Sequence, residues 1–229
     1  MKIIDSLTVV IYTSDELKTI LEGNNNYIYI YFGNDITLTS GINIFSTKTI
    51  ITIDGTYENS RYTFTDMKNL SGSSAISVVN SRSLNIVVKN MDITGYNYYG
   101  IIYVPDSANY QNVIVEYNNI TYIGSQISFH PFDLTKFINS NIIIQDNYAA
   151  GNEVAECNKI EIGGNTTILH KSTGNSFFWF RNSSPYFKIL EDAVVSFTSN
   201  SRELLYGVTN LSFILEENAT LTIIYMFFL

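Results

Sequence analysis

The sequence has little that could cross-link the chain or charge its surface. Its 229 residues include a single cysteine, Cys157, so an internal disulfide is excluded. Only 15% of the residues are charged, compared with roughly 25% in a typical globular protein. The 21 acidic residues outnumber the 13 basic ones, and no basic cluster interrupts this balance. This composition argues against a nucleic-acid partner.

Long apolar runs are missing as well. No segment approaches the roughly 20 apolar residues of a membrane-spanning helix, so we expect no membrane insertion by this segment. The first ten residues, MKIIDSLTVV, lack the basic start and the long apolar stretch of a secretion signal.

Short apolar strands recur every 25–29 residues. Val88 is followed after 27 residues by Val115 and after a further 29 by Ile144, each inside a short apolar run. The same spacing continues downstream at Ile162, Ile189 and Ile214. A repeat of this length, with β patterning inside each unit, predicts an all-β solenoid. Three short strands per repeat favour a single-stranded parallel β-helix over an antiparallel sandwich.

Residues 1–229 are predicted to form one β-helix domain, with a cap at 1–26 and coils over 27–229. Thr13 and Glu16 have the spacing of a capping box, and an apolar stripe follows them, which predicts an α-helix at about 14–22. The chain ends on the apolar strand TLTIIYMFFL. Because the open end of a solenoid needs shielding, we expect the sequence to be a fragment of a larger surface protein.

Parallel β-helices can carry polysaccharide lyases or glycosidases. A lyase acting on an acidic polysaccharide needs Ca²⁺ held by carboxylates from neighbouring coils and a basic residue to remove the proton. With the repeats aligned, no outward column gathers three carboxylates, so this alternative would rest on Asp92, Glu116 and Lys89, with Ca²⁺ as cofactor. His130 and His170 lack metal-ligand spacing. We therefore predict a non-catalytic module without a cofactor or a metal site.

Two aromatic clusters are candidates for binding. GYNYYGIIYV contains Tyr98 and Tyr99, and NSFFWFRN contains Trp179 beside Arg181. Since strand side chains alternate between faces, part of each cluster should face outward unless a loop covers it. Exposed Tyr and Trp stack on sugars and anchor protein partners. The alternative is that these aromatic residues fill the core or pack under loops.

Three stretches carry a resemblance to a known family. They are DELKTILE…YIYIYFGNDITLTSGINI…ITIDGT, VEYNNITYIGSQISF and NEVAECNKIEIGGNTTI. Together they resemble the pectate-lyase-like adhesive domains of Gram-positive surface proteins, typical of clostridia. The resemblance implies a right-handed parallel β-helix with an N-terminal helical cap, carried on secreted proteins at the cell surface. The W-x-D-H and R-x-P-x-x-R motifs of the enzymatic pectate lyases are absent.

The resulting hypothesis is a non-catalytic cell-surface module that binds a glycan or an extracellular host or matrix protein. The predicted contact residues are Tyr98, Tyr99, Trp179 and Arg181. The competing hypotheses are a pectate-lyase-like enzyme and a purely structural spacer.

Overall fold

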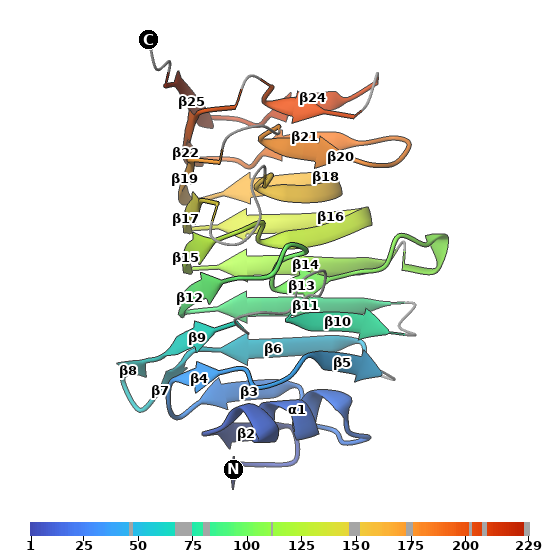
Figure 1. The fold of residues 1–229 in the computed structure, drawn as a ribbon, viewed down its shortest axis with the longest axis vertical. Coiled ribbons are helices and arrows are strands. Elements are labelled where there is room, and N and C mark those ends of the chain that lie inside the picture. Colours follow the sequence, from blue (N-terminus) through green and yellow to red (C-terminus); the bar gives the residue numbers. More distant parts are fainter. Residues whose placement is uncertain are drawn as a thin grey trace.

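The computed structural model is a parallel β-solenoid of about seven turns with one α-helix near its N-terminal end, which confirms the predicted fold class (Figure 1). The structure describes residues 1–45, 48–66, 75–79, 83–110, 112–146, 152–172, 176–201, 203–207 and 210–226. Within most turns the chain runs along three faces in succession, which we call the first, second and third face. Each face is a stack of parallel strands.

The first face begins where β1 (Lys2–Ile3) pairs antiparallel with β2. Its parallel strands are β2 (Thr8–Ile11), β3 (Tyr29–Phe32), β6 (Ile50–Asp54), β11 (Leu84–Lys89), β14 (Val113–Asn118), the second parts of β16 (Ser128–Ile138) and β18 (Ala155–Gly163), β21 (Tyr186–Ile189) and β24 (Ser212–Leu215).

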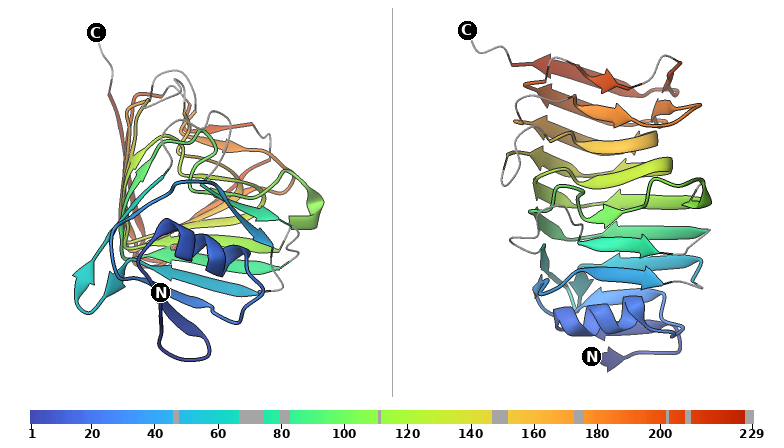
Figure 2. Two further views of the ribbon diagram at one scale, coloured as in Figure 1. Left: turned by 60° about the horizontal axis from the view of Figure 1, so that its bottom comes forward. Right: turned by 45° about the vertical axis from the view of Figure 1, so that its right-hand side comes forward.

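The second face is a separate sheet. Its strands are β4 (Ile36–Thr37), β9 (Thr63–Thr65), β12 (Asp92–Gly95), β15 (Thr121–Gly124), β17 (Asn141–Ile144), β19 (Asn165–His170), β22 (Val194–Ser199) and β25 (Thr220–Tyr225). A short hairpin, β7 (Thr56–Tyr57) with β8 (Ser60–Arg61), precedes β9 and projects from the body of the solenoid (Figure 2).

The third face joins the first through the long strands β16 and β18. Its strands are β5 (Ile42–Phe45), β10 (Ile76–Val79), β13 (Ile102–Tyr103), the first parts of β16 and β18, β20 (Phe178–Phe180) and β23 (Leu205–Tyr206). A short 3-10 helix, η1 (Ala108–Tyr110), lies between β13 and β14.

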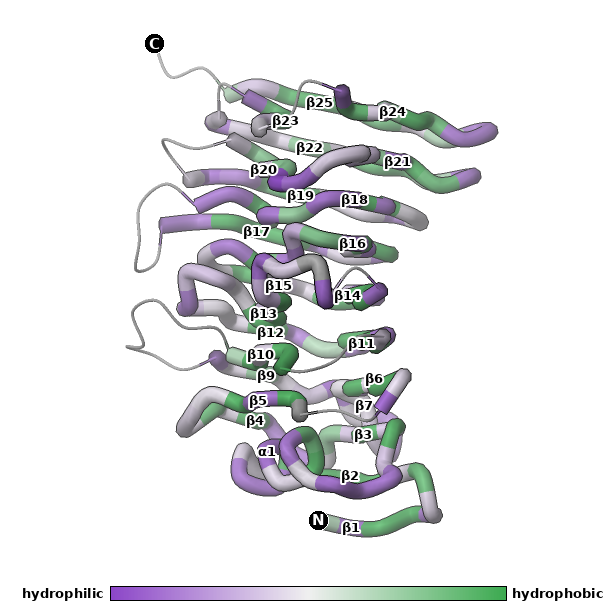
Figure 3. The backbone as a smooth tube through the Cα atoms, turned by 90° about the vertical axis from the view of Figure 1, so that its right-hand side faces the viewer, coloured by the Kyte–Doolittle hydropathy of each residue, from purple (hydrophilic) through white to green (hydrophobic). Residues whose placement is uncertain are grey.

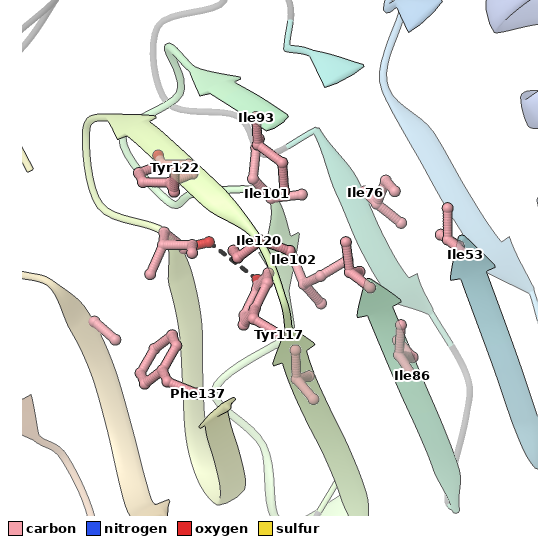
Figure 4. Close-up of a cluster of buried hydrophobic side chains, with 14 of the residues drawn as sticks. Ile53, Ile76, Ile86, Ile93, Ile101, Ile102, Tyr117, Ile120, Tyr122 and Phe137 are labelled. Atoms are coloured by element: carbon pink, nitrogen blue, oxygen red, sulfur yellow. Dashed lines mark hydrogen bonds between the residues drawn. The ribbon is translucent and has the colours of Figure 1, made fainter. Parts of the chain in front are cut away.

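Apolar side chains from all three faces meet inside the solenoid. Strongly apolar segments recur from turn to turn along the backbone (Figure 3). Tyr117 and Phe137 are fully buried, and their rings stack with centroids 5.7 Å apart (Figure 4). The hydroxyl of Tyr117 donates to the carbonyl of Ile127 at 3.1 Å, which satisfies a polar group inside the core.

The predicted repeat is present, but the alignment of its anchor residues is wrong. Val88 pairs in register with Tyr117 and not with Val115, and Ile144 lies on the second face. The reason is that turns differ in length: Tyr117 is followed by its neighbour Phe137 after only 20 residues, because β16 runs from the third face onto the first.

The helix α1 (Ser14–Glu22) confirms the predicted cap. The hydroxyl of Thr13 accepts a hydrogen bond from the backbone N–H of Glu16, as the capping-box spacing predicts. Leu17, Ile20 and Leu21 are buried, and the helix lies across the N-terminal end of the solenoid (Figure 2). No helix in the described part of the chain is long and apolar enough to cross a membrane.

The corner between the first and second faces repeats one backbone conformation. In successive turns a single residue there has a positive φ between 53° and 58°, or 49° at Asn139: Asn90, Asn119, Asn139, Gly164, Asp192 and Asn218. Their side chains also bond between turns. The Nδ2 of Asn119 donates to Oδ1 of Asn90 at 2.8 Å, and the N–H of Asn165 donates to Oδ1 of Asn139 at 3.0 Å. Asparagine suits this corner because it tolerates the left-handed region and bonds to nearby backbone.

We expect Asn139→Ala to lower the free energy of unfolding by about 2 kcal/mol, since alanine is strained at positive φ and cannot accept from Asn165. Asn139→Gly removes the same bond without the strain and should cost about half as much. Urea unfolding of the three proteins measures both effects. Equal losses in the two variants would contradict a role for the backbone conformation.

Candidate binding site

The outward side chains of the third face form a column of aromatic residues interrupted by one acid. Tyr103, Phe129, Glu156, Trp179 and Tyr206 pair in register on β13, β16, β18, β20 and β23. Parallel pairing places equivalent residues about 4.8 Å apart, so their side chains lie next to one another. We call these five residues the aromatic column. Their sequence spacings of 26, 27, 23 and 27 residues follow the solenoid repeat.

The loop between β12 and β13 adds two more rings to this column. Tyr99 lies with its ring centroid 5.4 Å from that of Tyr103 and 5.1 Å from that of Phe129. Tyr98 packs edge-on against Tyr99 at 5.0 Å. Phe129 is only 5% exposed beneath them, whereas the three tyrosines are half-buried. We call Tyr98, Tyr99, Tyr103 and Phe129 the tyrosine cluster.

A buried carboxylate from the preceding turn holds this loop in place. Asp66 is 1% exposed and accepts hydrogen bonds from the backbone N–H groups of Tyr96 and Asn97 and from the side-chain amide of Asn97. Gly100 closes the loop with a φ of +78°, and a Cβ there would lie 2.3 Å from the carbonyl atoms of Ile127. The loop therefore requires glycine at this position, and its tyrosines are pre-positioned before any ligand arrives.

Arg181 connects the two ends of the aromatic column. Its Nη1 donates to Oε2 of Glu156 at 2.9 Å, and Nη2 lies 3.5 Å from Oδ2 of Asp106. The guanidinium carbon lies 4.7 Å from the centroid of Trp179, where the charge interacts with the face of the ring. On its other side Trp179 packs against Tyr206, with centroids 5.5 Å apart.

Carboxyl groups dominate the electrostatics of the site. The side chain of Glu156 is 3% exposed, and burial raises its pKa although the Arg181 charge opposes the shift. Burial also raises the pKa of Tyr98, and the charges of Glu153 and Glu156 act in the same direction. The pKa of Tyr103 is raised, first by burial. The rings therefore lie in a negative potential.

The structure brings together all four of the predicted binding residues. Tyr98 and Tyr99 belong to the tyrosine cluster, and Trp179 and Arg181 lie one to two strands away on the same face. Sequence reasoning missed Phe129, Glu156 and Tyr206 as members of the site. Their repeat spacing would have identified them, but only with the correct alignment of the coils.

The residues proposed for a lyase do not form a site. Asp92 lies on the second face and pairs with Arg61 at 3.0 Å. Lys89 and Glu116 lie on the first face, where Lys89 pairs with Asp54 at 3.3 Å and Glu116 accepts from the amide of Asn118. The predicted column of Lys89 and Glu116 is wrong, because Lys89 pairs in register with Asn118 and Glu116 with Lys136.

The histidines and the cysteine are part of the interior. His130 pairs in register with Cys157, and both are fully buried, while His170 lies on the second face. Burial lowers the pKa of His130 to about 3 and raises that of the Cys157 thiol. In the described ranges, no three or more His, Cys, Asp or Glu side chains are arranged to hold a metal ion.

Comparisons with known proteins agree with this architecture. A family model described as "Putative pectate lyase-like adhesive domain" matches residues 8–129, which is more than half of the chain. No curated protein sequence matches the chain. The solved structure of the L. reuteri 53608 SRRP is similar over 93% of this chain and 78% of that one, with a TM-score of 0.70 and 17% identity. This last likeness concerns the fold.

Burial of neutral His130 should make the protein less stable in acid. Its folded pKa is about 3 and its unfolded value about 6.5, so below pH 6.5 only the unfolded chain takes up the proton. Stability is therefore complete above pH 6.5 and falls by about 1.4 kcal/mol per pH unit toward pH 3. We expect His130→Leu to lose less stability than the wild type across this range. Parallel pH profiles of urea unfolding for the two proteins would contradict the prediction.

Proposed function

The chain belongs to the family of pectate lyase-like adhesive domains, and on that premise we propose that it is an adhesion module that binds a glycan on its third face. The observation that carries this proposal is the aromatic column with its tyrosine cluster, beside the hydrogen-bonding groups of Glu156 and Arg181. The family match extends from residue 8 to residue 129 and so includes the whole tyrosine cluster.

Aromatic rings next to polar groups suit the two kinds of surface on a sugar. The C–H groups of a pyranose ring can stack on an aromatic face, while its hydroxyl groups need hydrogen-bonding partners. Tyr206 is 47% exposed and Trp179 is half-buried, so this pair can offer ring surface to a ligand. Tyr98, Tyr99 and Tyr103 offer a second surface of the same kind.

The distance between these two aromatic surfaces fits an oligosaccharide. Phe129 and Trp179 both pair in register with Glu156, one on each side. They are therefore two strand spacings apart, or roughly 10 Å along the solenoid axis. This is close to the length of two linked pyranose rings, so a linear glycan that follows the axis could stack at both ends and bond to the polar groups between them.

A glycan explains the site better than an extracellular protein does. Protein interfaces bury about 800 Å² on each partner and centre on an apolar core. Here the middle of the site is a buried ion pair, Glu156 with Arg181, and the exposed ring surface is a narrow strip along one column. An adhesive role fits a location at the cell surface, where the module would bind a glycan of a host, a matrix or another cell.

Removing two stacking rings tests the proposal. We expect Tyr98→Ala combined with Tyr99→Ala to weaken binding by at least about 10-fold, because both rings lie at one end of the site. A glycan array identifies the bound glycans, and isothermal titration calorimetry gives their affinities. The control is Tyr29→Ala, which removes a tyrosine that is 40% exposed on the first face. Absence of wild-type binding to every glycan, or equal binding by the double variant and the control, would refute it.

A further inference from the structure

We infer that the site selects glycans without negative charge and that a free amino group on the sugar strengthens binding. This inference rests on the proposed function and specifies the class of glycan. It follows from the charges around the aromatic column, from the pairing of the nearest cation, and from the position of one exposed carboxylate.

Arg181 is the cation at the site, and it is already engaged by carboxylates. Its guanidinium is 2.9 Å from Glu156 and 3.5 Å from Asp106. A third carboxyl group, that of Glu153, is 1% exposed and acts on the nearby Tyr98. The site therefore holds three carboxyl groups and one guanidinium. A uronate or sulfate approaching the rings would meet a negative potential.

An anionic ligand would also have to compete with Glu156 for Arg181. Glu156 is almost completely buried, and removing the partner of a buried charge is strongly unfavourable. Elsewhere in the described part of the third face, the outward residues in register with the aromatic column are the uncharged Asn43 and Ser77. Nothing in that column could compensate a ligand carboxylate with a positive charge.

The described lysines closest along the chain to the later turns lie on the first face and have acidic partners. Lys136 pairs with Glu161 at 2.9 Å and Lys188 pairs with Glu216 at 3.2 Å. These pairs run between neighbouring strands of the first face, in the column that also contains Glu116. They neutralise one another and leave the third face negative.

The same arrangement favours a positively charged group. The side chain of Asp106 is 45% exposed, and its contact with Arg181 is long, so it can accept from an ammonium group on a ligand. The faces of Trp179 and Tyr206 attract a cation as well. An amino sugar combines the stacking surface of a pyranose with such a group.

Two matched pairs of probes test the inference on the intact protein. Polygalacturonate is compared with its methyl ester, and N-acetylated chitin oligomers are compared with their deacetylated form, within a wider array that includes sialylated and sulfated glycans. We expect the array's binders to exclude anionic glycans. Where a backbone binds, the ester should bind at least about 10-fold tighter than the acid and the free amine tighter than the acetamide, with the differences shrinking as salt rises.

Two contrary outcomes are distinct. If uronates or sulfated glycans bind best and the Tyr98→Ala, Tyr99→Ala variant abolishes that binding, the selectivity is refuted while the proposed function stands. If no glycan binds, the proposed function fails and the inference fails with it.

A charge variant locates the effect at the site. Asp106→Asn keeps the shape of the side chain, and we expect it to weaken binding of the amino probe by about threefold to tenfold while neutral probes change less than about twofold. Glu217→Gln makes the same change of charge at an exposed residue of the corner between the first and second faces. Equal effects of the two substitutions on the amino probe would overturn the assignment.

Discussion

Parallel hydrogen bonding between successive turns is the constraint on which the rest of this structure depends. Each backbone ladder places a residue beside its equivalent one turn away, about 4.8 Å distant, so side chains of one type accumulate in columns. Inward columns supply the core, as with Tyr117 and Phe137. Outward columns become the ion-paired first face and the aromatic third face. A ligand-binding strip therefore follows from the same register that builds the core.

The site also depends on groups that interrupt the regular ladder. The tyrosine loop leaves the solenoid between β12 and β13, and its backbone N–H groups bond to Asp66 because no strand partner is available there. Gly100 allows the chain to return at positive φ. Glu156 occupies a position where an apolar residue would pack well, and only its bond to Arg181 makes its burial tolerable. Such local departures from the simplest packing are common where a fold carries a function.

Much of the architecture was predictable because it is local or periodic. The repeat predicted the parallel solenoid, and Thr13 with Glu16 predicted the start of the cap helix. Alternation within strands predicted that Trp179 would face outward. The alignment of Val88 with Val115 failed because one turn is short, and a shift of two residues moved Lys89 and Glu116 into different columns. Asp92, placed with them in the lyase hypothesis, lies on another face.

The sequence by itself determined the class of fold, the cap and the aromatic residues available for binding, since period, capping and alternation are properties of neighbouring residues. Only the tertiary structure decided which of those residues meet. Glu156 and Arg181 are 25 residues apart, and Asp106 is 75 residues from Arg181, yet all three lie around one guanidinium. Loop lengths set these contacts through the register of whole turns. A one-dimensional pattern cannot specify that register, because each turn can lengthen or shorten without disturbing the hydrogen-bonded ladder.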